Sequence, residues 1–397
     1  MAFFAASKNF ARFSPMVARW SLIQGVQKQI QWVQMSFRGG MNMNAQMLKE
    51  AMTPLERVTA ALMHKEADRV PVYPLLNGCN RRLINAGYPD WSLKPEVAFE
   101  GYVKATEEFG VDVICTLLDL SVEAADFGQE IIYPQIEAAH PNYKNCLIKD
   151  VEDYEKLTAI ELPANGRMMN AVRLNDMLVR KMGREYPIVA FVFGPMGTLS
   201  MLRGQSNLYM DLLDDPDAVH MGMRAVTDTL KKYIDELIAV GVPAIMLDTL
   251  FSSRSILSKR MWNEFEYPYV KELADHIIGK GCMTMIHNCG EGIYFDTQIE
   301  SIRPAAISYQ HFPDDCNSDE EVKAKYGDKT TLIGRIEPTW APFADEKELR
   351  AEIRRQIDIY APGGGFILAT GCEYPANADF RAAQIMVEEA RTYGKYK

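Results

Sequence analysis

Eight apolar segments, separated by longer helical patterns, constrain the fold of this chain more than any other feature of its sequence. Strands of a parallel sheet are buried on both faces and therefore read as continuous apolar runs rather than as alternating ones. Clear helical patterns lie between them, among them residues 218–241 and 347–361. The eight predicted strands are VPVYPLL (70–76), VDVICTLLD (111–119), PIVAFVFG (187–194), VPAIMLDT (242–249), CMTMIHNC (282–289), AAISYQHF (305–312), TTLIGRIEP (330–338) and GFILATGC (365–372).

Eight strands alternating with helices predict an α/β protein with a (β/α)8 TIM barrel over residues 50–397. A doubly wound sheet is the competing arrangement. The barrel begins with a strong helix signal, because Thr53 can cap the helix, Pro54 suits its first position and Glu56 completes a capping box. A small strand-rich insertion is expected after the second strand, over residues 124–162.

Residues 1–49 form a basic N-terminal extension that differs from the rest of the chain. This stretch contains no Asp or Glu, whereas its positive residues are Lys8, Arg12, Arg19, Lys28, Arg38 and Lys49. It resembles an organelle transit peptide, and residues 20–37 could form an amphipathic helix for a membrane surface or a partner. The alternatives are a helical extension packed on the barrel or an upstream start codon, with Met41, Met43 or Met47 as later starts.

Charge and cysteine content exclude several classes of protein. The net charge is -10, which argues against sequence-independent nucleic-acid binding because that needs a basic surface. Seven cysteines scattered through 397 residues do not form a secreted disulfide framework, so we expect a reducing, cytoplasmic setting. No apolar stretch reaches the roughly 18 residues of a transmembrane helix. A homo-oligomer is compatible with the sequence.

Soft metal ligands stand at the ends of two predicted strands. His287 and Cys289 end the fifth strand at positions i and i+2, so both side chains point to the same side, and Cys372 ends the eighth. In a barrel, chemistry takes place at these carboxyl ends. One His and two Cys can hold a catalytic zinc with an open fourth position. Alternatively, each cysteine is a small buried apolar group and the histidine a satisfied polar one.

From about residue 52 onward, the chain resembles the uroporphyrinogen decarboxylase superfamily of (β/α)8 barrels. The motifs that carry this resemblance are TPLERVTAALMHKEADRVPV, FVFGPMGTLSMLRG, IMLDT, MIHNCG, LIGRIEP and GGGFILATGCEYP. H-x-C-G with a later G-C is similar to the zinc-dependent, corrinoid-linked methyltransferases of that superfamily, including coenzyme M methyltransferases and O-demethylases. The resemblance implies that His287, Cys289 and Cys372 bind Zn2+.

Two departures from the family patterns bear on the reaction. Coenzyme M methyltransferases have acidic residues at the end of the sixth strand, where this chain has Gln310 and His311. Uroporphyrinogen decarboxylases carry an arginine-rich segment on the first strand, where this chain reads VYPLLNGCNRRL with Asn77 at the strand end. The first departure weakens the case for a thiol-methylating role, and the second weakens the case for decarboxylation.

Polar and aromatic residues at the strand ends are the candidates for catalysis and substrate binding. Asp248 and Glu337 end otherwise apolar strands, where an acidic group is costly unless it has a partner or a role; a salt bridge to Arg254 or Arg335 is the alternative. Together with His311 they are the predicted catalytic residues. The predicted substrate-binding residues are Tyr73, Asn77, Phe193, Met196, Tyr309, Gln310 and Tyr374.

These features predict an enzyme that transfers a methyl group from a small methylated donor, preferably a methoxylated aromatic, to a Co(I) corrinoid. A partner protein would carry the corrinoid, because none of the six histidines lies in a D-x-H-x-x-G cobalamin motif. Three alternatives stay open: a methyl-cobalt:thiol methyltransferase, a decarboxylase, and a zinc-stabilised binding protein without catalytic activity.

Overall fold

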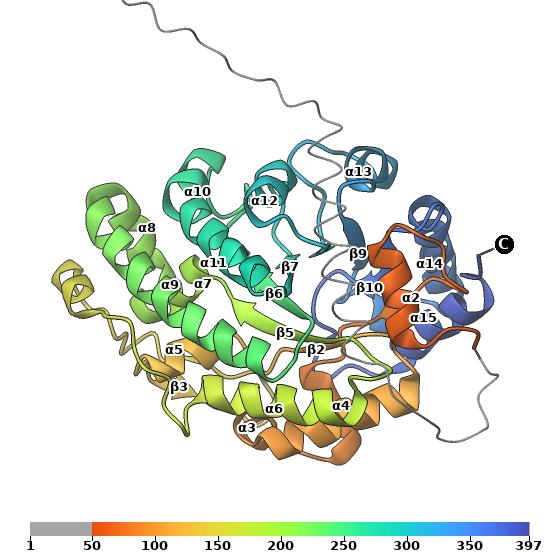
Figure 1. The fold of residues 1–397 in the computed structure, drawn as a ribbon, viewed down its shortest axis with the longest axis horizontal. Coiled ribbons are helices and arrows are strands. Elements are labelled where there is room, and N and C mark those ends of the chain that lie inside the picture. The colour runs from red at the N-terminus through yellow and green to blue at the C-terminus, as the bar shows by residue number, and fades with distance from the viewer. Residues whose placement is uncertain (1–49, 397) are drawn as a thin grey trace, which may run out of the picture.

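Parallel strands and helices alternate along the computed structural model, which describes residues 50–396 (Figure 1). All eight predicted strands are present. The predictions for residues 1–49 lie outside the described residues. The strands of the main sheet are β1 (Val72–Tyr73), β2 (Ile114–Thr116), β5 (Ile188–Phe193), β6 (Ala244–Asp248), β7 (Met283–Asn288), β8 (Ala306–Tyr309), β9 (Thr331–Ile336) and β10 (Phe366–Thr370).

The sheet curls into a barrel whose strands follow the order β1-β10-β9-β8-β7-β6-β5-β2. Every neighbouring pair is parallel. The two end strands meet as well, because the main-chain nitrogen of Asp112 donates a hydrogen bond to the Val72 carbonyl at 2.9 Å. The predicted (β/α)8 barrel is therefore confirmed, and the doubly wound alternative is wrong.

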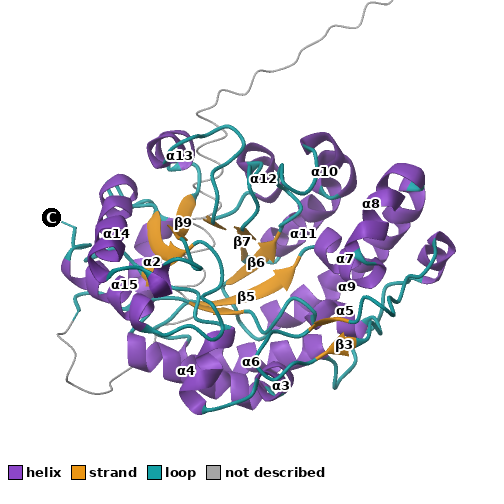
Figure 2. Ribbon diagram, turned by 180° about the vertical axis from the view of Figure 1, so that it is seen from behind, coloured by secondary structure: helices purple, strands orange, loops and turns teal. Residues whose placement is uncertain are grey.

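Helices ring the outside of the barrel (Figures 1 and 2). Short 3₁₀ turns are η1 (Gly78–Ile84), η2 (Val151–Lys156) and η3 (Ala341–Phe343). The α-helices are α2 (Pro54–Leu62), α3 (Tyr88–Leu93), α4 (Pro95–Phe109), α5 (Val122–Asp126), α6 (Arg167–Met182), α7 (Pro195–Arg203), α8 (Gln205–Asp214), α9 (Pro216–Ala239), α10 (Lys259–Phe265), α11 (Tyr267–Gly279), α12 (Phe295–Ile302), α13 (Asp319–Tyr326), α14 (Glu346–Tyr360) and α15 (Arg381–Thr392).

Helix α2 closes the amino-terminal end of the barrel. Its predicted capping box is present, since the Thr53 side chain accepts from the Glu56 nitrogen and the Glu56 side chain accepts from the Thr53 nitrogen. Val58 and Leu62 on its inner face belong to the same buried cluster as Met283 in the barrel interior. With this end plugged, the carboxyl ends of the strands form the open face.

The predicted strand-rich insertion contains less strand than expected. Two short strands, β3 (Ile131–Ile132) and β4 (His140–Pro141), form an antiparallel pair. The later segment CLIKDVEDYEKL contains η2 instead of a strand. The Asp153 side chain fixes the start of this helical turn, because its Oδ2 accepts from the Lys149 nitrogen at 2.9 Å and from the Asp150 nitrogen at 3.2 Å.

The first strand is also shorter than predicted, with two residues instead of seven. Pro71 and Pro74 flank it and cannot donate the ladder hydrogen bonds that would extend it. Among residues 50–396, no helix combines the length and apolar character needed to cross a membrane. All seven cysteines lie in this part of the chain and are free thiols.

Candidate metal centre

Three side chains that are far apart in sequence meet at the open face of the barrel. His287 lies near the end of β7, Cys289 directly follows that strand, and Cys372 lies two residues after β10. Their ligand atoms, one ring nitrogen and two sulfurs, all lie within 4.8 Å of one another. Because β8 and β9 separate β7 from β10 in the sheet, the cluster spans part of the barrel mouth. The structure thus brings together the three predicted ligands.

The geometry and chemistry of this cluster fit a zinc ion. Ligand atoms of a tetrahedral zinc with two sulfurs and a nitrogen stand about 3.8 Å apart, given bonds of about 2.0–2.3 Å. His287 is buried, whereas both cysteines are partly exposed, so the cluster is accessible from one side. The Nδ1 atom of His287 pairs with the Ser308 hydroxyl at 3.0 Å, which leaves Nε2 for a metal.

The two thiols of the cluster differ in their readiness to ionise. Hydrogen bonding from Cys289, together with His287, lowers the pKa of Cys372. The same sulfur contact, with burial, raises the pKa of Cys289 above its usual range. One thiolate is therefore stabilised before any metal binds, and thiolates are the form of cysteine that binds metals.

Two carboxyl groups flank the cluster. Asp248 ends β6 and pairs in register with His287; burial raises its pKa to about 6, and its Oδ1 accepts from the Leu250 nitrogen at 3.0 Å. Glu373 follows Cys372, and its Oε1 accepts from the Gly78 nitrogen at 2.8 Å. Desolvation raises the pKa of Glu373 to about 7. Both groups can hold a proton near neutral pH, which suits acid-base chemistry.

A cavity of about 610 Å³ opens between the ends of β8 and β9 and helix α14, and none of the three cluster residues lines it. The Gln310 amide donates to the Glu337 carboxylate, and Gln310 also packs against Gly371, the neighbour of Cys372. Glu337 forms no salt bridge to Arg335, which pairs with Asp319 at 2.7 Å instead. The cavity is lined by Gln310, His311, Arg335, Glu337, Trp340, Glu348, Ala351, Glu352 and Arg355.

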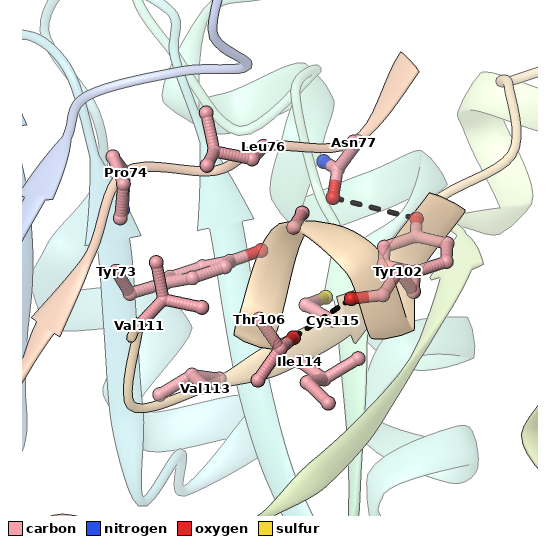
Figure 3. Close-up of a pocket in the computed structure, with 11 residues that line it drawn as sticks. Tyr73, Pro74, Leu76, Asn77, Tyr102, Thr106, Val111, Val113, Ile114 and Cys115 are labelled. Carbon is pink, nitrogen blue, oxygen red and sulfur yellow. Dashed lines mark hydrogen bonds between the residues drawn. The ribbon is translucent and has the colours of Figure 1, made fainter. Parts of the chain in front are cut away.

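Tyr73 and Asn77 lie around a second, much smaller cavity (Figure 3). Its volume of about 20 Å³ is enough for a single water molecule rather than a substrate. The Tyr102 hydroxyl donates to the Leu117 carbonyl at 3.0 Å and approaches the Asn77 side-chain oxygen at 3.5 Å. The structure thus places these two predicted substrate-binding residues in the packed wall below the mouth.

Four other predicted substrate-binding residues are buried, and the polar contact of Tyr309 turns it away from the cluster. Tyr309 is buried and its hydroxyl donates to that of Tyr360 on α14 at 2.8 Å. Successive residues of a strand face opposite sides, so Ser308 points inward at His287 and Tyr309 points outward. The remaining side chains are also almost fully buried: Phe193, Met196 and Tyr374.

Several residues of the site were missed at the sequence level. Ser308 contacts His287, and Glu373 directly follows Cys372. The only sequence signal for either residue is its position next to a residue at a strand end. Two buried glutamates support the loop after β5: Glu123 accepts from the Phe193 nitrogen at 2.9 Å, and Glu266 accepts from the Met196 nitrogen at 3.2 Å. Burial raises the pKa of each of these glutamates to about 8.

Comparison with known proteins agrees with this architecture. A family model described as uroporphyrinogen decarboxylase (URO-D) matches residues 53–393. The chain belongs to the uroporphyrinogen decarboxylase family. The resemblance that the sequence motifs indicated is therefore confirmed.

Relatives within this family carry out different reactions. A methylcobamide:CoM methyltransferase of Methanosarcina acetivorans is 22% identical over 347 residues, which cover 86% of this chain and 98% of that protein. A uroporphyrinogen decarboxylase of Xanthomonas campestris pv. campestris is 23% identical over 366 residues, covering 86% and 99%. A methyltransferase structure from Methanosarcina mazei shares the fold, with a TM-score of 0.73 at 18% identity over 86% of this chain and 99% of that one. Because the two identities are nearly equal, overall similarity does not separate methyl transfer from decarboxylation.

Proposed function

We propose that this protein is a zinc-dependent methyltransferase that moves a methyl group between a small substrate and a corrinoid carried by a partner protein. The observation that carries the proposal is the cluster of His287, Cys289 and Cys372 at the open face of the barrel. Relatives named methylcobamide:CoM methyltransferases, which match 86% of the chain, support it. The corrinoid is assigned to a partner because the sequence has no D-x-H-x-x-G motif.

In this proposal the chain's own residues bind the metal and supply a proton. A zinc ion at the cluster supplies a Lewis acid, which stabilises charge on a leaving oxygen or lowers the pKa of a bound thiol. Ser308 orients the His287 ring through the contact at Nδ1. Asp248, which pairs in register with His287, holds a proton that can pass to a leaving group. Glu337 and His311 line the cavity between β8, β9 and α14, where they would orient the substrate.

We assign the direction of demethylation, from a small methylated donor such as a methoxylated aromatic to the corrinoid. Gln310 directly follows β8, the sixth barrel strand, at a position where the resemblance to coenzyme M methyltransferases implies an acidic residue. A phenolate is the leaving group of an aryl methyl ether, and a proton from a nearby acid stabilises its departure. The raised pKa of Asp248, about 6, supports that role.

The arginines near the first strand argue against decarboxylation of a polycarboxylate. Arg81 donates to the carbonyls of Gly78 and Ala376 at 3.0 and 2.8 Å. Arg82 donates to the Ala378 carbonyl and stacks on Phe380. The buried guanidinium group of Arg81 is therefore occupied by the chain's own main chain, whereas Arg82 is exposed.

Elemental analysis of the purified protein tests the proposal. We expect about one zinc per chain, lost in His287→Ala and Cys372→Ala while the circular dichroism spectrum is unchanged. Cys282→Ala is the matched control, because Cys282 is a buried thiol at the opposite end of β7. The absence of zinc from protein purified without chelator would contradict the proposal and favour decarboxylation.

A further inference from the structure

Cys289 and Cys372 place two thiols close together at the mouth of the barrel. Their sulfurs lie within 4.8 Å of each other, although the two cysteines are far apart in sequence. The S–S bond of a disulfide is about 2.05 Å long, so the sulfurs have to approach by less than about 3 Å to form one. The two thiols are therefore a small movement away from a covalent bond.

Neither cysteine is held within the sheet. Cys289 directly follows β7, and Cys372 lies two residues after β10. A change of side-chain rotamer at either position moves the sulfur without breaking a hydrogen bond between strands. Both side chains are also partly exposed, so an oxidant that enters the mouth of the barrel can reach them.

The other five thiols are placed differently. Four of them are almost fully buried: Cys79, Cys115, Cys282 and Cys316. Cys146 is partly exposed, but it lies in the insertion after β2, and its sulfur contacts the Tyr143 carbonyl at 3.5 Å. Because oxidants react with thiols that they can reach, the pair at the barrel mouth is the preferred place for a disulfide.

We propose that Cys289 and Cys372 are a site of reversible oxidation, at which a hydroperoxide joins them in a disulfide that excludes zinc. One sulfur attacks a peroxide oxygen, the O–O bond breaks, and a sulfenic acid and the first water form. The other sulfur attacks the sulfenic sulfur, an S–S bond forms, and the S–OH oxygen leaves as the second water. Two thiols thus lose two electrons and two protons, and hydrogen peroxide is reduced to two water molecules.

Zinc and the disulfide compete for the same sulfur atoms. Zinc is bound by thiolate sulfur, which carries a negative charge, whereas the sulfurs of a disulfide are uncharged. Oxidation would leave His287 as the remaining ligand of the cluster. Conversely, a sulfur bound to zinc has donated the electron pair with which it would attack the peroxide. The inference goes beyond the proposed function, because the disulfide depends on the position of two thiols and not on methyl transfer.

Mass spectrometry of the full chain tests the inference. Reduced, metal-free protein is treated with hydrogen peroxide and then denatured without reductant. We expect a loss of about 2 Da, the mass of two hydrogen atoms, and a fall in free thiols from seven to five. Digestion should release one pair of linked peptides, which contain Cys289 and Cys372. Dithiothreitol should restore the original mass and thiol count.

Bound zinc should slow this oxidation in proportion to its occupancy. At a free zinc concentration of about 100 times the Kd, about 1% of the chains are metal-free at any moment. The disulfide should then form about 100-fold more slowly than in metal-free protein. The oxidised protein should bind no zinc, and after reduction it should regain about one zinc per chain.

Variants of single cysteines identify the two partners. Cys289→Ser and Cys372→Ser should each abolish the loss of about 2 Da, and the remaining cysteine should gain oxygen because its sulfenic acid has no second thiol to attack it. Cys146→Ser is the matched control, because Cys146 is the other partly exposed thiol. It should form the disulfide as the unmodified protein does, and circular dichroism should show all three variants folded.

Oxygen added to Cys289 or Cys372 of the unmodified chain without a link between them would overturn the inference. Equal rates of disulfide formation with and without zinc would also overturn it, as would zinc binding by the oxidised protein. The proposed function is judged separately. Absence of zinc from the reduced protein would contradict that function, whereas the linked peptides would still establish the disulfide.

Discussion

Replacing Ser308 with alanine should weaken zinc binding without disturbing the fold. The Ser308 hydroxyl contacts Nδ1 of His287 at 3.0 Å, and Ser308 and His287 are only 0% and 5% exposed. Without this contact the ring loses the group that fixes its orientation and tautomer. Loss of such a supporting partner reduces metal affinity by about 10–100-fold. Because the hydroxyl is uncharged, we expect zinc affinity to fall about tenfold, which corresponds to the loss of one ordinary hydrogen bond.

Competition against a chromophoric zinc chelator measures this loss. Ser301→Ala is the matched control, because Ser301 is also buried but its hydroxyl donates to the Thr297 carbonyl of its own helix at 2.8 Å. The control should bind zinc as the unmodified protein does. Equal zinc affinities in Ser308→Ala and Ser301→Ala, with both proteins folded, would refute the role assigned to Ser308.

Three further predictions concern the metal, pH and stability. Chelation should remove zinc and activity but leave the circular dichroism spectrum intact, because the barrel core does not depend on the cluster; unfolding on chelation would point to a structural zinc. Burial raises the pKa of Glu123 from 4.5 to about 8, so the folded chain holds a proton that the unfolded chain releases. The free energy of unfolding should then fall by about 1.4 kcal/mol per pH unit as pH rises from about 4.5 to 8. Urea titrations at several pH values should show a weaker pH dependence for Glu123→Gln. An equal pH dependence in both proteins would contradict a protonated Glu123. Arg57→Met removes one partner of the buried Asp112, 2.6 Å away, and should reduce the free energy of unfolding by about 3 kcal/mol; urea denaturation with no measurable loss would show that Arg69 alone compensates Asp112.

Most of the fold could be predicted from the sequence because parallel strands buried on both faces leave a continuous apolar signal. The capping box at Thr53 and Glu56 was equally readable, since its spacing is local. The insertion was not, because two strands of two residues each produce no periodicity. The 3₁₀ turn after Asp150 was missed for a similar reason, because it depends on the short-range capping of the chain by the Asp153 side chain rather than on the apolar residues before it.

The cluster of His287, Cys289 and Cys372 could be predicted because each of these residues lies at or near the end of a recognisable strand and the ends of barrel strands converge. The substrate-binding residues were harder, since a strand end alone does not reveal which way a side chain points. Tyr309 and Ser308 are adjacent, but only Ser308 faces the cluster. The contacts of the Gln310 side chain come from Glu337 and Gly371, which follow β9 and β10, so no single stretch of sequence reveals them.

Methyl transfer itself is the most direct test of the account. Zinc-loaded protein is mixed with Co(I) cobalamin and 2-methoxyphenol, and the absorbance spectrum is followed for methyl-Co(III) cobalamin while chromatography follows catechol. The account predicts that both products form together, that they require zinc, and that Cys372→Ala forms neither. Zinc-loaded protein that forms neither product from any aryl methyl ether, or Cys372→Ala that forms both at the same rate, would contradict the account.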